Sequence, residues 1–306
     1  MMHLTRRFHR QFVLFAIVVG SAMAASQAAA EEELRWKLTK GEKLDYVITL
    51  NSDMNMNLGP QGQAKATVMQ QTDMTWEVQG VDESGNATIL LSTDRMQLKT
   101  TGPQSVEYDS QSEEAPAGMA AMIAPLFEAM TKGKFEFTMS PLGEVTNVVV
   151  PQEVIDALKN SPGAQMMGDM ASAEGFKQTL SQGTLVLPKE MPTAGFQWTS
   201  SIQMKNPMVG QQNVETTYTY DGTKDVDGKT YDLIKPSVKM SFEGQGPVQM
   251  TLKDQKSGGE ILFDRTAGRL HSSKIEQDMA MGMNIAGQAV EQEIHQVIDV
   301  QVTPAE

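Results

Sequence analysis

Methionine is the residue type whose number and spacing point most directly to chemistry in this sequence. The chain contains 23 Met, against 10 Phe, 5 Tyr and 3 Trp. Two runs, Met54-x-Met56 and Met279-x-Met281-x-Met283, each follow an aspartate, at Asp53 and Asp278. Residues spaced by two share one face of a β-strand. Thioethers suit Cu(I), adaptable methionine surfaces bind apolar ligands, and methionine also fills irregular cores. The sequence leaves these three interpretations as alternatives.

Side chains that commonly catalyse reactions or bind metals are few. His271 and His295 are the only histidines after residue 30, and the chain has no cysteine. A histidine triad or zinc site needs partners at fixed spacing, and none is present, so we expect both histidines at the surface. The sequence also lacks a nucleophile elbow, a phosphate loop and a dinucleotide fingerprint. Its 38 acidic residues make some carboxylate pair inevitable and therefore uninformative. We expect no enzyme activity, no cofactor and, unless the methionines bind Cu(I), no metal.

The first methionine run lies in a long alternating stretch, residues 44–58. Its even positions are apolar apart from Ser52, and its odd positions are polar apart from Val47. This period of two predicts one strand about 50 Å long with one buried face. Such a strand needs partners of similar length. Residues 64–78 and 288–302 supply them, because their apolar residues also recur at even positions.

Turn residues join these stretches into hairpins. Gly59-Pro60-Gln61-Gly62 follows the first long strand. Between Leu91 and Met96 the apolar positions change parity, which predicts a β-bulge. Three hairpin tips, near residues 56–63, 208–212 and 283–288, share a methionine-containing plan. This echo indicates a diverged internal duplication, and convergence of amphipathic hairpins is the alternative.

Other segments predict helices, a loop and a crossing. Apolar residues from 119 to 130 fall on one helical face, although Pro125 predicts a kink or a late start. Residues 151–158 predict a short helix that opens on a proline, and residues 166–180 a weaker one. Residues 102–116 are polar and predict a loop. Residues 185–195 predict a proline-rich crossing to a second half, and Trp36 with Leu38 predicts the start of the sheet.

The first 30 residues have the pattern of a secretory signal peptide. Arg6, Arg7 and Arg10 precede a short apolar run at 12–19, and small residues end at Ala30. We expect cleavage near Ala30, export, and a soluble mature protein in the periplasm or outside the cell. Neither this run nor any later one is long enough to span a bilayer, so we expect no transmembrane segment in the mature chain.

Charge narrows the range of partners. The chain has a net charge of −13, which becomes more negative when the three signal-peptide arginines are removed. Such a charge argues against nucleic acids and anionic membrane surfaces as partners. Without cysteine there are no disulfides, so packing must supply the stability.

A set of separated residues carries a family resemblance. Trp36-Lys37-Leu38 with Gly41 and Tyr46, followed by Leu187-Pro188 with Gly195 and Trp198, is similar to a family of uncharacterised exported bacterial proteins, a domain of unknown function. The resemblance covers nearly all of the mature chain and implies no catalytic residues. Met191-Pro192-Thr193-Ala194 replaces the more valine-rich spacer expected there. More loosely, long antiparallel strands with helices on one face resemble the half-barrel lipoprotein carriers of the periplasm, an analogy of architecture alone.

Together these patterns predict a β-rich α+β fold. We expect one large, curved antiparallel sheet of long strands, half-barrel-like, with two or three helices packed on one face. Residues 31–306 should form a single domain. Its pseudo-repeats, at about 31–160 and 185–306, are joined by the helical and proline-rich segment.

The predicted function is binding. We expect a non-enzymatic exported protein that holds an apolar or lipid-like ligand in a groove between the sheet and the helices. The candidate ligand-binding residues are Met54, Met56, Met74, Trp76, Met122, Leu126, Met130, Met279, Met281 and Met283. The alternatives are a structural or protein-interaction component of the cell envelope, and Cu(I) binding through the Met-x-Met pairs.

Overall fold

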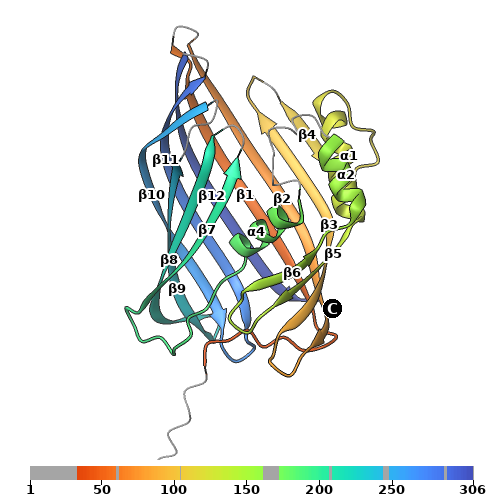
Figure 1. Ribbon diagram of the computed structural model, residues 1–306, viewed down its shortest axis with the longest axis vertical. Helices are drawn as coiled ribbons and strands as arrows, with labels where there is room; N and C mark the ends of the chain where they lie inside the picture. The colour runs from red at the N-terminus through yellow and green to blue at the C-terminus, as the bar shows by residue number, and fades with distance from the viewer. Residues whose placement is uncertain are drawn as a thin grey trace, which may run out of the picture. The chain divides into compact units, whose positions relative to one another are not determined.

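The long alternating stretch forms a central strand of a large antiparallel sheet in this computed structural model (Figure 1). Strand β1 (Lys43–Asn57) pairs with β2 (Gln63–Val81) on one side and with β12 (Gln288–Pro304) on the other. Leu44 lies opposite Trp76 and Met56 opposite Ala64, so the hairpin keeps one register over its length. Both neighbours repeat the alternation of β1, which puts the apolar side chains of all three strands on one face.

The structure describes residues 33–59, 62–103, 105–160, 172–206, 209–243, 248–285 and 288–305. Within this part, the other strands are β3 (Ala87–Thr101), β4 (Val106–Asp109), β5 (Lys134–Met139), β6 (Val145–Val149), β7 (Gln197–Asn206), β8 (Gly210–Val226), β9 (Lys229–Glu243), β10 (Val248–Asp264) and β11 (Arg269–Ile285). The helices are α1 (Met119–Lys132), α2 (Gln152–Asn160) and α4 (Ala173–Gly183). The predicted signal peptide, residues 1–30, lies outside the described residues. So do Met166, Met167, Met170 and parts of the predicted hairpin tips, at 60–61, 207–208 and 286–287.

The strands follow the order β6-β5-β3-β2-β1-β12-β11-β10-β9-β8-β7, with β4 paired to β3. The first and last strands of the chain are therefore neighbours in the middle of the sheet. The two ends of this order, β6 and β7, flank the helical segment in the sequence. The sheet is curved and does not close (Figure 1). The predicted β-rich α+β fold with helices on one face is confirmed, whereas the internal duplication stays a prediction.

Helix α4 and residues 185–187, from the segment between β6 and β7, pack into the opening of the sheet (Figure 1). Helix α4 contacts both strands. Residues 185–187 then cross the core, where Trp36 Nε1 donates a hydrogen bond to the Leu185 carbonyl at 3.0 Å. Trp198 Nε1 donates to the Val186 carbonyl at 2.7 Å. Because two indole N–H groups hold these carbonyls, the predicted crossing is a fixed part of the core.

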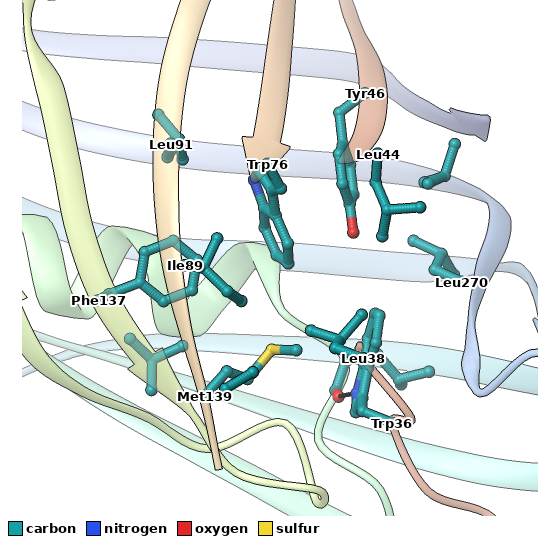
Figure 2. Packing of buried hydrophobic residues seen from close by; sticks show 14 of the residues in the cluster. Trp36, Leu38, Leu44, Tyr46, Trp76, Ile89, Leu91, Phe137, Met139 and Leu270 are labelled. Carbon is teal, nitrogen blue, oxygen red and sulfur yellow. Dashed lines mark hydrogen bonds between the residues drawn. The ribbon is translucent and has the colours of Figure 1, made fainter. Parts of the chain in front are cut away.

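Aromatic side chains fill the end of the sheet where β1 begins, the lower end in Figure 1. Tyr46 stacks on Trp76 with ring centroids 4.4 Å apart, and Trp76 meets Phe137 edge-on at 5.3 Å (Figure 2). Trp36 meets Phe263 edge-on at 5.4 Å. All five side chains are buried in one larger cluster of apolar residues, and we call this whole cluster the aromatic core.

Removal of the Tyr46 hydroxyl should leave the protein as stable as before, or about 1 kcal/mol more stable. The hydroxyl is buried without a hydrogen-bond partner among the described residues, and burial raises the pKa of Tyr46 well above its ordinary value. A buried donor without a partner costs roughly 1–3 kcal/mol. Urea unfolding of Tyr46→Phe measures the effect. Tyr220→Phe, which removes a bonded hydroxyl, is the matched control. An equal loss of stability in both variants would contradict the finding that the Tyr46 hydroxyl has no hydrogen-bond partner.

A short strand interrupts the stretch predicted as a loop. Strand β4 pairs with Gln97 to Thr100 of β3, and Tyr108 packs against α1 with its ring 5.0 Å from that of Phe127. Arg95 holds the end of β4, with Nη2 2.6 Å from Asp109 Oδ2 and Nε 3.1 Å from Oδ1. The prediction of a continuous loop over 102–116 is wrong, because two alternating apolar residues are too few for a recognisable strand pattern.

Acid should remove the contribution of the Arg95–Asp109 pair. The hydrogen bonds from Arg95 lower the pKa of Asp109 from 3.8 to about 2. A carboxyl whose pKa is depressed by folding stabilises the fold above its unfolded-state pKa, and this contribution is lost as pH falls from about 4 through about 2. The difference in melting temperature between the protein and Arg95→Gln should therefore be largest near neutral pH and shrink in acid. A difference that does not change with pH would contradict this.

Two local predictions have opposite outcomes. The β-bulge is confirmed, since Asp73 pairs with Arg95 but Met74 pairs with Thr93, which leaves one extra residue in β3. Trp36 does not begin the sheet, and that prediction is wrong. The backbone N–H of Trp36 donates a hydrogen bond to the carbonyl of Pro141, which lies in a turn, at 2.9 Å. The alternation of apolar residues there reflects burial in the aromatic core rather than strand pairing.

Candidate functional site

The two faces of the sheet differ in charge. Directly paired residues lie on the same face. Pairing therefore assigns the even positions of β1, β2 and β12, and the odd positions of β11 from Ser273 onward, to the face of the aromatic core, which we call the inner face. None of the described residues at these positions is charged. The outer positions of the same strands carry Lys43, Asp45, Asp53, Lys65, Asp73, Glu77, Lys274, Glu276, Asp278, Glu291, Glu293 and Asp299.

A row of neutral polar side chains crosses the inner face. Ser52 on β1 lies opposite Gln296 on β12, and Gln296 lies opposite Gln277 on β11. Gln277 in turn lies opposite Ser257 on β10. Gln296 Nε2 donates a hydrogen bond to Gln277 Oε1 at 2.6 Å. We call these four residues the polar row, because side chains that lie directly opposite one another on four neighbouring strands form one continuous line.

The polar row also bridges β10 to β9 where their backbones part. Paired positions between these strands involve only residues 261–263 and 232–234 in the described part of the chain. Farther up, Ser257 Oγ accepts from the Val238 N–H at 2.6 Å and donates to the Val238 carbonyl at 2.9 Å. Gln255 also bonds to the backbone of β9, because its Oε1 accepts a hydrogen bond from the Met240 N–H at 2.9 Å. These side chains replace the backbone pairing, so the inner face continues onto β9.

Beyond the polar row, toward the upper end of the sheet, the inner face is mostly apolar and rich in methionine, with the neutral amides of Gln292 and Gln212 beside Met54 and Met240. Its methionines are Met54, Met56, Met204, Met240, Met250, Met279, Met281 and Met283, and we call this surface the methionine face. Met279 and Met281 are buried, at 7% exposure each. The other six are partly exposed. Close-packed cores bury such side chains fully. The described residues therefore cover this apolar surface only in part.

The structure brings five of the predicted ligand-binding residues onto the methionine face. Ile294 of β12 pairs with Met54 on one side and with Met279 on the other. Met56, Met281 and Met283 continue the two runs on the same face. The prediction that each methionine run lines one surface is confirmed, and the register shows that the two surfaces are one.

Met74 and Trp76 lie on the same inner face but farther down. Met74 is opposite Tyr46, and both Met74 and Trp76 pack in or against the aromatic core. Along β1, Tyr46 and Met54 are about 26 Å apart at the usual rise per residue. The structure therefore separates these two residues from the methionine runs, with which the sequence grouped them.

The predicted helix residues have different surroundings from the methionine runs. Leu126 and Met130 are partly buried against the aromatic core, whereas Met122 is 53% exposed. Helix α1 packs on β3 and β4, where Ala124 is buried beside Tyr108. In the strand order, β3 lies two strands from β1 and further still from β11. Helix α1 thus covers a part of the inner face other than the methionine face.

The aspartates that precede the methionine runs meet on the outer face. His295 lies opposite both Asp53 and Asp278, with its Nδ1 2.7 Å from Asp278 Oδ1. This hydrogen bond raises the pKa of His295 above its ordinary value. The His295 side chain is 49% exposed, as predicted for a surface histidine, while His271 stacks on Tyr231. Over the described ranges, no three His, Cys, Asp or Glu side chains are arranged to hold a metal ion.

An ion pair is buried where β8, β9 and the turn after β10 meet. Asp232 is 2% exposed and accepts hydrogen bonds from Tyr220 Oη at 2.8 Å and from Arg265 Nε at 3.0 Å. Arg265 Nη2 also donates to Asp232 and, at 3.0 Å, to the Tyr220 hydroxyl. Burial, together with Asp232, raises the pKa of Tyr220 to about 12. The cluster ties the turn to two strands that enter the aromatic core.

The fold is an open antiparallel sheet whose inner side is part packed core and part exposed apolar surface, and this side is uncharged on β1, β2, β12 and the part of β11 from Ser273 onward. The chain belongs to a family of unknown function (DUF6263), whose profile matches residues 84–288. The predicted membership of such a family is confirmed, although Trp36 and Tyr46, which supported it, lie outside the matched residues. No functionally curated protein matches the sequence. None of the described helices is both long and apolar enough to cross a lipid bilayer.

Three solved structures are similar to the chain. A lipovitellin structure, described by its lipid–protein interactions, has a TM-score of 0.47 and 13% identity, covering 88% of this chain and 26% of that one. DynF of the dynemicin pathway of Micromonospora chersina has a TM-score of 0.22 and 8% identity, covering 89% and 86%. An outer membrane channel of Pseudomonas putida F1 has a TM-score of 0.25 and 9% identity, covering 90% and 98%. The chain thus spans about a quarter of the lipovitellin chain.

Proposed function

We propose that this protein is a non-enzymatic binding protein that holds an apolar, lipid-like ligand on its methionine face. The observation that carries the proposal is the partial exposure of an uncharged, methionine-rich surface on the inner side of a curved sheet. Contiguous apolar surface left exposed marks interaction sites. Covering it contributes about 25 cal/mol for each Å² removed from water.

The methionines suit a ligand with flexible chains. A thioether side chain has three rotatable bonds and adapts its shape to what it contacts. Surfaces that accept varied apolar partners use methionine for this reason. The aromatic core below is buried and packed, with Trp76 and Phe137 at 6% and 0% exposure. The upper part of the inner face is therefore the part that a ligand would occupy.

Titration with an apolar fluorescent probe tests the proposal. Protein that has been unfolded, extracted with organic solvent and refolded is titrated with N-phenyl-1-naphthylamine, whose emission rises in apolar surroundings. We expect a saturable rise that a lipid extract of the host cells reverses. Native mass spectrometry of protein purified without detergent should show the bound lipid. No saturable signal and no bound lipid would contradict the proposal, and a bound protein chain in place of lipid would support an envelope-interaction role instead.

We further propose that the protein acts after export. The support is the basic, apolar and small-residue pattern of residues 1–30. N-terminal sequencing of protein recovered from fractionated cells should give a chain that begins near Glu31, outside the cytoplasm. A chain that still begins at Met1 in the cytoplasmic fraction would contradict export.

A further inference from the structure

We infer that the ligand is an uncharged lipid whose ester, amide or hydroxyl groups hydrogen-bond to the polar row while its chains lie along the apolar residues on either side. This inference rests on the proposed function and adds the chemical class of the ligand. Three features of the inner face carry it: its charge, its free hydrogen-bonding groups and the position of those groups between two apolar surfaces.

Around the polar row, the described positions of the inner face carry no charge that could neutralise an ionised group. No charged residue occupies the described inner positions of β1, β2, β11 and β12. The inner positions of β10 that neighbour the polar row, from Leu252 through Gln255 to Ile261, are uncharged as well. A carboxylate or phosphate placed there would lose its water without gaining a counter-ion, which is strongly unfavourable. The net charge of −13 also repels anionic lipids at longer range.

The polar row keeps hydrogen-bonding capacity for a ligand. A glutamine amide carries two N–H donors and one acceptor oxygen. Among the described residues, the side chain of Gln277 makes one hydrogen bond, through its oxygen, to Gln296. Gln277 is 6% exposed as a whole residue, and its amide nitrogen, which has no acceptor in the described part of the chain, is not a fully buried atom. A carbonyl or hydroxyl oxygen of a ligand on the inner face can therefore accept a hydrogen bond from this accessible N–H group.

The position of the polar row between apolar residues determines where the polar group of the ligand lies along its chain. On β1, Leu50 precedes Ser52 and Met54 follows it, both on the inner face and both partly exposed. Ile298 and Ile294 flank Gln296 on β12 in the same way, and both are partly exposed. A neutral polar linkage with apolar chain on both sides matches this arrangement. A diacylglycerol has such a polar part between two acyl chains, whereas a fatty acid ends in an ionised carboxylate.

Competition between lipids of equal chain length tests the inference. 1,3-Didecanoylglycerol, decanoate and decane each compete with bound N-phenyl-1-naphthylamine at about pH 8, where a free carboxyl group is ionised. The neutral ester should displace the probe at a concentration at least about tenfold lower than decanoate. Gln277→Leu should remove most of the preference for the ester over decane. Gln301→Leu, on the outer face of β12, should leave that preference unchanged.

The outcomes separate the inference from the proposed function. If decanoate competes as well as the ester, or if Gln277→Leu keeps the preference of the unmodified protein, the inference is overturned and the binding function stands. If neither the probe nor any of the three lipids binds, the binding function fails and the inference falls with it. Should Gln277→Leu fail to fold, Gln296→Leu replaces it, because the Gln296 side chain is only partly buried.

Discussion

Replacing Arg265 with methionine should lower the free energy of unfolding by about 3–5 kcal/mol. The substitution keeps the length of the side chain but leaves the Asp232 carboxylate, 2% exposed, without its cation. Only the Tyr220 hydroxyl bond to that carboxylate would remain of the cluster. A buried charge that loses its partner keeps its full desolvation cost, which is why the loss is large. Urea unfolding followed by circular dichroism measures it.

Two control variants show whether burial is the cause. Lys274→Met removes the pair with Glu276, in which both side chains are more than half exposed, and should cost less than about 1 kcal/mol. The double variant Arg265→Met with Asp232→Leu should recover most of the lost stability, because no buried charge is left. Equal losses for Arg265→Met and Lys274→Met would show that the cluster is not buried as described.

Met54→Glu should weaken binding of a neutral apolar probe by at least about tenfold, which corresponds to about 1.4 kcal/mol. Glutamate has nearly the length of methionine but places a carboxylate among the apolar neighbours Ala66 and Ile294. A ligand that covers Met54 would have to desolvate this charge without a counter-ion, because the polar neighbour at Met54 Sδ, the Gln292 amide at 3.4 Å, is neutral. Because Met54 is partly exposed before binding, the unliganded protein should keep its fold. Titration with N-phenyl-1-naphthylamine measures the affinity for the probe, and a thermal melt shows whether the fold is kept.

Asn55→Glu is the matched control for Met54→Glu. It adds the same charge at the next residue of β1, on the outer face, between Lys65 and Glu293. Its affinity for the probe should equal that of the unmodified protein. Met54→Gln, which is neutral and of the same length, should lose much less affinity than Met54→Glu. If both glutamate variants bind the probe equally well, the ligand does not lie on the methionine face.

The architecture could be predicted from the sequence wherever a pattern is long. Alternation over residues 44–58 predicted strand, length and buried face together, and β1 pairs with both neighbours as that pattern requires. Alternation gives the face of a residue but not its height along the sheet. This is why Met54 and Trp76 were grouped in one site, although the register puts them on either side of the polar row.

Features that depend on several strands at once could not be predicted in this way. Ser52 was visible as the one polar residue at an even position between Leu44 and Leu58. Its partners Gln296 and Gln277 became recognisable only when the register placed them beside it. The short strand β4 was missed for a related reason, because its identity comes from pairing with β3 and not from its own four residues.

Peroxide oxidation of methionine, with and without a bound apolar ligand, tests the methionine face most directly. Oxidation follows the exposure of each thioether, and this chain carries both the test residues and internal controls. Bound ligand should slow the oxidation of Met54, Met56 and Met283. It should leave Met69 on the outer face and Met122 on α1, which are 49% and 53% exposed, unchanged. Unchanged oxidation of Met54, Met56 and Met283 under saturating ligand, or equal protection of Met69 and Met122, would contradict the proposed site.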